Sequence, residues 1–324
     1  MPRAFLTGGT GFIGSRLAHA LTQSGWDVVA LVRSVDNAKH LESVGVRLAI
    51  GDITQPHTLD EPLYGCDAVF HLAAMLKFGV ADRHGMVRVN VHGTRNVLEA
   101  ASAAAVSRVV YCSTIGVLGR GEPSEVRDET SVHPDYFPSA YEETKWEAHQ
   151  LVRKKIADGM PAVVVLPGVV YGPGETGLLS RLIGMYARGW LLAMPRMDWA
   201  ASYVHVDDVV RGILQAFEKG RVGEEYVLGG DNATLRELFD RLAPIAGVRP
   251  PRFQIAEKLL PLARPFGPII ARALGQPPRF VQEGLDSLHG SYMASSAKAE
   301  RELGYHFRAL EDGMGEVLRW AKEH

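Results

Sequence analysis

The sequence predicts an α/β fold, a Rossmann-type doubly wound parallel sheet with a smaller α/β substrate lobe at its C-terminal end. Three observations support this prediction. Short runs of β-branched residues alternate with longer amphipathic stretches in the first half of the 324-residue chain. These apolar runs are continuous, as in strands that helices cover on both faces. A glycine-rich turn directly follows the first run, at the edge where such sheets bind ligands.

Each element of the first half is predicted from its local pattern. Strands are expected where apolar residues run together, and helices where apolar residues recur every three or four positions. The expected strands are AFLTG (4–8), DVVALV (27–32), VRLAIGD (46–52), AVFHLAA (68–74), RVVYCST (108–114) and AVVVLPG (162–168). The expected helices are GSRLAHALTQSG (14–25), a long helix through NVHGTRNVLEAAS (90–102), and AYEETKWEAHQLVRKKIADG (140–159).

The regular alternation stops after about residue 170, where glycine and proline interrupt the pattern in YGPGETG. We therefore expect a dinucleotide-binding domain over residues 1–170, which also takes in roughly 200–230. Residues 171–324 are expected mainly to form the substrate-binding lobe.

The segment from Pro244 to Pro278 is rich in proline and in apolar residues. We expect short broken helices that pack on one another here, with a substrate lid or a membrane-contacting surface as alternatives. Arg264, Arg272 and the internal prolines argue against a membrane-spanning helix. The leucine, isoleucine and phenylalanine side chains of this segment, Leu259 to Ile270, suit an apolar or aromatic substrate.

The composition narrows the class of protein. The hydrophobic content of 46% and charged content of 22% are ordinary for a globular protein, and the net charge of −2 argues against nucleic-acid binding. We expect neither a signal peptide nor a membrane span, because no apolar stretch approaches ~20 residues. The two cysteines, Cys66 and Cys112, lack metal-ligand spacing, so a cytoplasmic protein without a structural metal is expected.

The turn TGGTGFIG places four glycines between the first strand and the first helix. Gly8 would permit the tight turn, Gly11 would let the backbone approach a pyrophosphate, and Gly14 would allow close packing of helix on strand. The helix N-terminus would then present free N–H groups to the phosphates. The alternative is a tight turn without a ligand.

The second predicted strand ends in LVRS. At this point of a dinucleotide site, an acid accepts the free 2′-hydroxyl of the ribose, whereas an arginine accommodates a 2′-phosphate. This chain has Arg33 there, with Ser34 and Lys39 as polar neighbours. We therefore expect NADP as the cofactor rather than NAD; a solvated surface arginine is the alternative.

Of the ten tyrosines, only Tyr141 has a lysine four residues later, Lys145. A helix would place both side chains on one face, just after a buried strand that ends in Ser113 and Thr114. Tyr141 could act as general acid or base if its pKa fell from about 10, and the Lys145 ammonium would lower it. Either Thr114 or Ser113 could hold the substrate oxygen.

Together these motifs resemble the extended branch of the short-chain dehydrogenase/reductase family, within the epimerase/dehydratase superfamily and close to the dihydroflavonol 4-reductase-like group. TGGTGFIG is similar to that branch's TGxxGxxG, and GDITQP, HLAA, VNVHGTRNVLEAA, LPGVVYGPGE and YVHVDDVVRGILQAFE resemble its later segments. The resemblance covers nearly the whole chain.

The resemblance implies a set of site residues and a homodimer. Thr114, Tyr141 and Lys145 would be the catalytic set, with Lys145 also holding the nicotinamide ribose. The homodimer would form through two long helices near 86–105 and 140–157. The implied cofactor-binding residues are Gly8, Gly11, Phe12, Ile13 and Gly14 in the turn, Arg33, Asp52 and Ile53 near the adenosine, Ala73 beside the ribose, and Pro167 and Val170 near the nicotinamide.

One departure from the family pattern bears on the substrate. Sugar-nucleotide members commonly carry an arginine just before the strand similar to YVHVDD, where it pairs with the diphosphate. Here Ala200, Ala201 and Ser202 precede that strand's Tyr203, and Arg196 lies too far along the chain to substitute readily. We therefore expect a substrate without a nucleotide diphosphate.

The favoured function is an NADP(H)-dependent oxidoreductase that reduces a ketone or aldehyde, or oxidises the alcohol. The alternatives are a nucleotide-sugar epimerase or dehydratase with tightly bound NAD, and a non-catalytic dinucleotide sensor. His205, Asp207 and Asp208 could suggest a metal site, but Asp207 and Asp208 are better interpreted as caps of the following helix. No metal is expected.

Overall fold

The computed structural model describes residues 1–76, 82–133, 136–175, 177–191, 193–195, 197–251, 253–255, 269, 272 and 290–323. Its main sheet has seven strands in the order β10-β6-β5-β4-β1-β2-β3, and all of its pairings are parallel. The strands are β1 (Arg3–Thr7), β2 (Asp27–Val32), β3 (Arg47–Ile50), β4 (Ala68–His71), β5 (Arg108–Cys112), β6 (Ala162–Pro167) and β10 (Glu225–Leu228). The strand order reverses between β1 and β4, which is the switch point where doubly wound sheets bind ligands.

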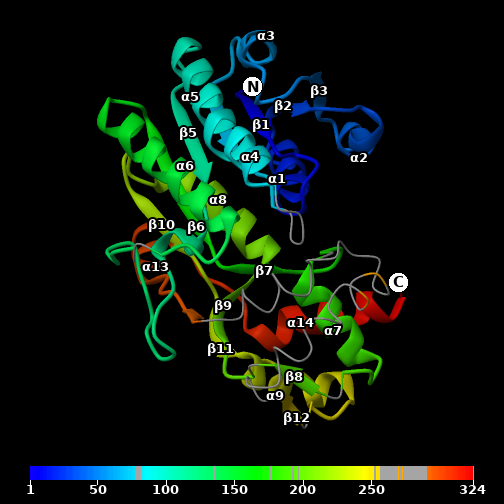
Figure 1. Ribbon diagram of the computed structural model, residues 1–324. Helices are drawn as coiled ribbons and strands as arrows, with labels where there is room; N and C mark the ends of the chain where they lie inside the picture. Colours follow the sequence, from blue (N-terminus) through cyan, green and yellow to red (C-terminus); the bar gives the residue numbers. More distant parts are fainter. Residues whose placement is uncertain are drawn as a thin grey trace.

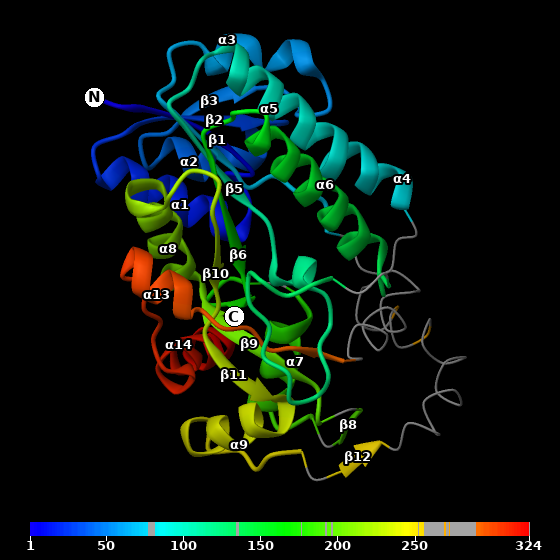
Figure 2. The same ribbon diagram turned by 90° about the vertical axis from the view of Figure 1, so that its left-hand side faces the viewer.

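Helices cover both faces of this sheet, as Figure 2 shows. The helices α1 (Phe12–Gln23) and α8 (Val206–Lys219) pack on one face, and α5 (Thr94–Ala103) and α6 (Ala140–Ala157) pack on the other. Shorter helical segments are η1 (Asp36–Ala38), α2 (Lys39–Glu42), η2 (Pro56–Thr58), α3 (Asp60–Leu63), α4 (Arg83–Met86), η3 (Val87–Gly93) and η4 (Ile115–Leu118). Continuous apolar strands are buried between these layers, so the predicted fold class is confirmed.

Local signals set the helix boundaries. The Ser139 side chain accepts a hydrogen bond from the backbone N–H of Glu142 and caps α6. The long helix predicted through 90–102 is present, but its first part, η3, is a π-helical turn that leads into α5. Such turns arise from backbone hydrogen bonding that hydrophobic periodicity does not reveal.

A second, smaller sheet lies below the first in Figure 1. It contains β7 (Val169–Tyr171), β9 (Ala200–His205), β11 (Asp231–Thr234) and β13 (Ser291–Tyr292), while β8 (Ala193–Pro195) pairs with β12 (Phe253–Ile255). The helices of this region are α7 (Leu178–Ala187), α9 (Leu235–Ala246), α13 (Ala297–Leu303) and α14 (Leu310–Glu323). A separate apolar core joins α7, α9 and α14. Most of the proline-rich segment lies outside the described residues, although Pro244 sits inside α9.

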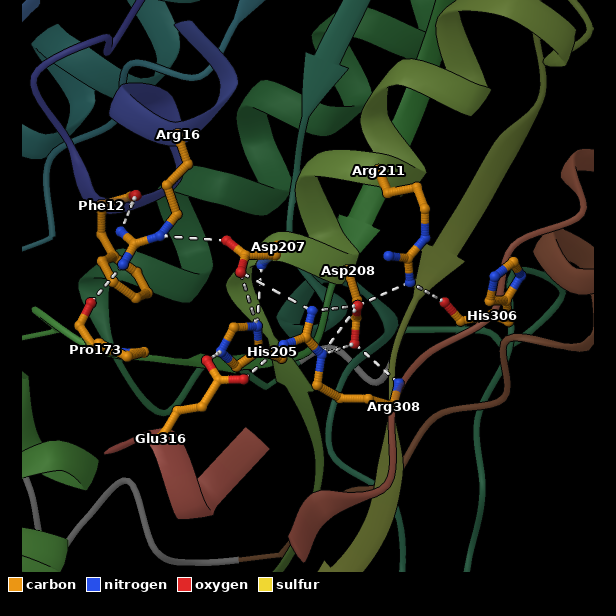
Figure 3. Close-up of polar contacts among 10 residues, drawn as sticks. All are labelled: Phe12, Arg16, Pro173, His205, Asp207, Asp208, Arg211, His306, Arg308 and Glu316. Carbon is orange, nitrogen blue, oxygen red and sulfur yellow. Dashed lines mark hydrogen bonds and ion pairs between the residues drawn. The ribbon is translucent and has the colours of Figure 1, made fainter. Parts of the chain in front are cut away.

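An ionic cluster around the buried Asp208 ties these two regions together (Figure 3). Asp208, only 1% exposed, accepts hydrogen bonds from Arg211 and from the backbone and side chain of Arg308. The prediction that Asp207 and Asp208 cap α8 is wrong: the His205 side chain caps this helix by accepting from the Asp207 N–H. The ring nitrogen of a histidine can accept a hydrogen bond as an aspartate oxygen does. The residue types at the start of the helix therefore did not show which side chain caps it.

The same cluster reaches the glycine-rich turn. The Arg16 guanidinium donates to the carbonyl oxygens of Phe12 and Pro173 and lies 3.4 Å from Asp207. It thereby joins the start of α1 to the loop after β7 and to α8 (Figure 3). Across the described ranges, no helix is both long and apolar enough to cross a membrane.

Candidate active site

A cavity of about 450 Å³ opens beyond the carboxyl ends of β5 and β6. Strand ends, the start of α6 and the smaller region all contribute to its walls. From the predicted set it is lined by Ile13, Thr114, Tyr141, Lys145, Pro167 and Val170. The fold therefore brings the proposed catalytic residues together with one residue of the glycine-rich turn.

The glycine-rich turn has the geometry that its spacing predicts. Gly8 has φ of +76°, and a Cβ at this position would lie 2.7 Å from the Ala73 nitrogen. A Cβ at Gly14 would lie 2.1 Å from the Gly8 carbonyl oxygen, so only glycine lets α1 approach the turn after β1 this closely. Gly11 donates its N–H to the Gly8 carbonyl oxygen, 2.9 Å away. The turn leaves an open backbone cradle at the N-terminus of α1.

The expected adenosine-binding residues lie outside the cavity, around the ends of β2 and β3. Arg33 is exposed just after β2, and within the described ranges no hydrogen bond or ion pair engages its guanidinium. Lys39, in contrast, pairs with Asp36 at 2.8 Å. Arg33 is therefore the cation available at this position.

Three further predicted residues have structural partners of their own. The Asp52 carboxylate accepts from the Thr54 N–H at 2.8 Å, and the buried Ile53 side chain packs against Gly93. The Ala73 N–H donates to the Thr7 hydroxyl at 3.2 Å. These contacts fix the backbone along the carboxyl edge of the sheet.

Tyr141 is partly buried on the first turn of α6, one turn before the buried Lys145. Burial raises the pKa of Tyr141, and the Lys145 charge only partly opposes this. The expectation that the pKa of Tyr141 is lowered is therefore wrong for this structure, because the sequence does not reveal how far the phenol is removed from water. The phenol is held protonated, as a proton donor requires.

Lys145 is anchored by a residue that the sequence analysis missed. Its ammonium donates to the Tyr111 hydroxyl at 3.2 Å and to the Cys112 carbonyl oxygen at 2.9 Å. Tyr111 is almost fully buried on β5, and burial raises its pKa well above the ordinary value. Burial also raises the pKa of the Cys112 thiol to about 11, so Cys112 is a structural residue rather than a nucleophile.

The two hydroxyl candidates for the substrate oxygen differ in their partners. The Ser113 hydroxyl contacts the buried His149 ring at 3.0 Å. Thr114 is partly exposed. Among the described residues, its hydroxyl has one hydrogen bond, which it accepts from the Gly116 N–H at 3.2 Å, so the Thr114 O–H is the freer donor toward the cavity.

The far wall of the cavity is apolar and aromatic, and the sequence analysis did not identify it. Its residues come from α7, β9, α9 and β13: Leu178, Leu179, Leu182, Trp199, Tyr203, Leu235 and Tyr292. The amphipathic stretch LLSRLIGMYA could have pointed to α7, but the other residues are far apart in sequence. The apolar residues expected from 259–270, apart from the exposed Ile269, lie outside the described residues, as does Arg196.

A buried carboxyl group was also missed. Glu142 follows Tyr141 and accepts a hydrogen bond from the Tyr292 hydroxyl at 2.8 Å, with Arg120 at 3.6 Å. Burial raises the pKa of Glu142. The contact ties the start of α6 to β13. Within the residues that the structure describes, no three His, Cys, Asp or Glu side chains cluster as metal ligands would.

Comparison with known proteins agrees with this geometry. The model of the NAD dependent epimerase/dehydratase family matches residues 4–229, which span the glycine-rich turn, Tyr141 and Lys145. The chain belongs to this family. A human relative carries the short-chain dehydrogenase/reductase name and is 27% identical over 98% of this chain and 87% of its own length, so the expected family is confirmed.

Two bacterial relatives are similar over almost their whole length. A 4-hydroxy-2-methyl-3-oxo-4-farnesyl-3,4-dihydroquinoline-1-oxide ketoreductase of Stigmatella aurantiaca is 33% identical over 98% of this chain and 96% of its own. A Synechocystis sp. protein whose name places it with the dihydroflavonol 4-reductases is 28% identical over 99% and 94%. The relatives thus include ketoreductases of small molecules.

Solved structures share the fold. The crystal structure of gox2253 has a TM-score of 0.84 and 33% identity, covering 100% of this chain and 99% of that one. The dTDP-glucose 4,6-dehydratase DesIV of Streptomyces venezuelae, solved with NAD and TYD, has a TM-score of 0.78 and 26% identity, covering 99% and 97%. The family comprises enzymes that use nicotinamide dinucleotides.

Proposed function

We propose that this protein is an NADP(H)-dependent oxidoreductase that reduces a ketone or aldehyde of a non-nucleotide small molecule, or oxidises the corresponding alcohol. The observation that carries this proposal is the cavity itself. Thr114, Tyr141 and Lys145 meet there against an apolar and aromatic wall. Names of similar proteins, such as the Stigmatella ketoreductase, agree with this reaction class.

The residues present fit a dinucleotide. The Gly8–Gly14 turn leaves room that a Cβ would fill, and the N-terminus of α1 offers backbone N–H groups to phosphates. Arg33 would hold the 2′-phosphate, and Lys145 the nicotinamide ribose. The bound dinucleotide would supply the hydride.

The side chains of the site supply the proton and hold the oxygen. Thr114 and Tyr141 would donate hydrogen bonds to the carbonyl oxygen, which orients the carbonyl carbon. Because burial raises the pKa of Tyr141, this phenol starts protonated and transfers its proton as negative charge develops on the oxygen. The Lys145 ammonium would then stabilise the phenolate. General acid catalysis of this kind contributes roughly 10²–10⁴-fold.

The proposed substrate has an apolar or aromatic body and no nucleotide diphosphate. Leucine and aromatic side chains line the wall opposite the catalytic set, whereas Ala200, Ala201 and Ser202 of β9 are buried, small and uncharged. A diphosphate requires cations close to its oxygens.

A substrate panel tests this proposal. The purified protein is given NADPH with apolar ketones, aldehydes, UDP-glucose and dTDP-glucose, and loss of absorbance at the reduced nicotinamide band is followed together with Tm. We expect NADPH consumption and a raised Tm with apolar ketones only, since a ligand that binds the native state stabilises it. Conversion or micromolar binding of a sugar nucleotide would instead support the epimerase or dehydratase alternative.

A further inference from the structure

Glu142 lies in the cavity wall directly after Tyr141, and it has no part in the proton transfer proposed above. The residue lines the cavity together with Ser139 and Tyr292, although it is only 8% exposed. Burying a carboxylate is costly unless its oxygens receive hydrogen bonds. The partners of the two Glu142 oxygens therefore show what this group can still bind.

The described donors to this carboxylate all address one of its two oxygens. The Tyr292 hydroxyl donates to Oε1 at 2.8 Å, and the Ser139 hydroxyl lies 3.4 Å from the same atom. The Arg120 guanidinium lies 3.6 Å from it. The other oxygen, Oε2, is buried and has no hydrogen-bond partner among the described residues. Because buried polar atoms in proteins are nearly always hydrogen-bonded, an unpaired acceptor in a cavity wall points to a group that binds a ligand.

The directions of the hydrogen bonds make this cluster an acceptor. An arginine can only donate, so the Tyr292 hydroxyl accepts from Nε of Arg120 at 2.6 Å. The hydrogen of that hydroxyl is then directed to Oε1 of Glu142. The Arg120 guanidinium also lies over the Tyr292 ring, 5.3 Å from its centre, which holds the ring in place. The cluster therefore has an acceptor oxygen to offer a substrate, rather than a donor.

Glu142 lies close to the residue that would hold the carbonyl oxygen. Cγ2 of Thr114 and Cγ of Glu142 each lie 3.5 Å from the position that a Cβ would take at Gly116, so the two side chains flank the same glycine. All three residues line the cavity. A substrate whose carbonyl oxygen is held by Thr114 could thus reach Glu142 through a group only a few atoms away.

The protein does not fully compensate the charge of this carboxylate. Burial raises the pKa of Glu142, and the hydrogen bond from Tyr292 and the charge of Arg120 only partly oppose this. A hydrogen-bond donor on the substrate would favour the charged form, whereas an anionic substituent would be repelled.

We propose that Glu142 determines substrate specificity by accepting, at Oε2, a hydrogen bond from a hydroxyl or N–H group that the ketone carries near its carbonyl. The proposal depends on the function proposed above and narrows its substrate class. The substrate is a neutral ketone with an apolar body and one such donor. A site of this kind rejects an analogue without the donor, because the buried acceptor is then left unpaired.

Matched ketones test this proposal in steady-state kinetics with NADPH. The probes are α-, ortho-, meta- and para-hydroxyacetophenone, each with its methoxy counterpart, which cannot donate a hydrogen bond. We expect kcat/KM of at least one hydroxy ketone to exceed that of its counterpart by about 10- to 150-fold, the worth of a hydrogen bond to a charged group. Glu142→Gln should remove or reverse this preference, because an amide nitrogen donates where Oε2 accepts.

Two further variants serve as controls. Glu143→Gln makes the same change at the next residue of α6, where the carboxylate pairs with Arg83 at 2.7 Å and does not line the cavity, and it should keep the preference. Tyr292→Phe cuts the tie between α6 and β13 but leaves the carboxylate, so it should keep the preference as well. Each ratio is measured within one protein and so does not depend on the fraction that is folded.

Three results would overturn the proposal. The first is an equal kcat/KM within every pair for the wild type, a comparison that requires no variant. The second is a preference that survives in Glu142→Gln, because it would then be steric. The third is an equal loss of preference in Tyr292→Phe, because Glu142 would then act only by joining α6 to β13.

Binding without turnover separates this inference from the proposed function. If ketones are reduced but every hydroxy and methoxy pair is equivalent, the inference alone fails. If no ketone is reduced, the proposed function fails, and the inference is judged by calorimetric titration of the same pairs into the protein with NADP⁺. Tighter binding of a hydroxy ketone that is lost in Glu142→Gln supports the role of Glu142. Equal binding within every pair contradicts it.

Discussion

The ammonium group of Lys145 lies 3.2 Å from the hydroxyl of Tyr111, and a second hydrogen bond of 2.9 Å joins it to the main-chain carbonyl of Cys112. Both partners belong to β5, the strand that leads to Ser113 and Thr114. The sheet therefore fixes the position of the charge on α6. In the proposed function, this anchoring would let a single ammonium act both on the Tyr141 phenol and on the nicotinamide ribose.

Lys145→Met is expected to impair both turnover and cofactor affinity, because the same charge stabilises the phenolate and would bind the ribose. A lost charge-assisted hydrogen bond costs about 1.5–3 kcal/mol, or roughly 10- to 150-fold in affinity. NADPH titration by fluorescence quenching and steady-state kinetics measure the two effects. Lys154→Met, which removes an exposed lysine from the same helix, is the control. Unchanged NADPH affinity in Lys145→Met would show that this lysine does not bind the cofactor.

Gly14→Ala is expected to destabilise the protein and to weaken NADPH binding. The added methyl would lie 2.1 Å from the Gly8 carbonyl oxygen, so α1 must move away from the turn at a cost of about 1–3 kcal/mol. Gly315→Ala, where the new methyl has only ordinary contacts of 3.7 Å or more, should leave Tm nearly unchanged or slightly raised. Thermal unfolding with and without NADPH tests both variants. Equal Tm values for the two would argue against close packing at Gly14.

Arg33 is expected to determine cofactor choice. NADPH should bind at least about tenfold more tightly than NADH, and Arg33→Asp should reverse that order because an acid accepts the 2′-hydroxyl. The control is Arg95→Asp on the exposed face of α5. It makes the same change of charge away from the cofactor site and should have little effect on the affinity for either dinucleotide. Titration of NADPH and NADH against the wild type, Arg33→Asp and Arg95→Asp measures these affinities. Equal affinities in the wild type would refute the assignment of NADP.

Glu225 is expected to make stability sensitive to acid. Burial alone would raise its pKa, but His149 and Arg153 outweigh burial and lower the pKa from 4.5 to about 2. Its contribution is therefore present above pH ~4.5 and is lost as the pH falls toward ~2. A shift of this size corresponds to about 3 kcal/mol. Denaturant unfolding between pH 6 and 2 measures the loss. Glu225→Gln should be less stable than the wild type at pH 6, and its stability should depend less on acid. Parallel curves of stability against pH for the two proteins would contradict the lowered pKa of Glu225.

The sequence was sufficient to predict the elements of the main sheet because each is specified locally. The apolar runs form β1 to β6. As the glycine spacing predicts, a side chain at Gly14 would clash with the Gly8 backbone. Tyr141 and Lys145 lie in the same cavity because helical spacing alone places them on one face. Expectations of a homodimer and of a cytoplasmic location stay predictions.

The remaining features depend on contacts between distant segments. His149 meets Glu225 only because β10 joins the sheet beside β6, and Trp199 and Tyr292 reach one cavity from separate strands. The raised pKa of Tyr141 results from burial, which no local pattern reveals. The pattern of a single sequence does not predict which residues from distant segments come into contact.

The central claim is that a ketone receives hydride from NADPH and a proton from Tyr141. The most direct test incubates the wild type and Tyr141→Phe with a ketone and with NADPH that carries deuterium at the transferred position. The mass of the alcohol product is then measured by mass spectrometry. Tyr136→Phe, at a tyrosine that is 68% exposed, is the control. We predict an alcohol with one deuterium on its carbinol carbon, formed about 10²–10⁴-fold more slowly by Tyr141→Phe although NADPH still binds. An unlabelled product, or near-normal turnover by Tyr141→Phe, would contradict the account.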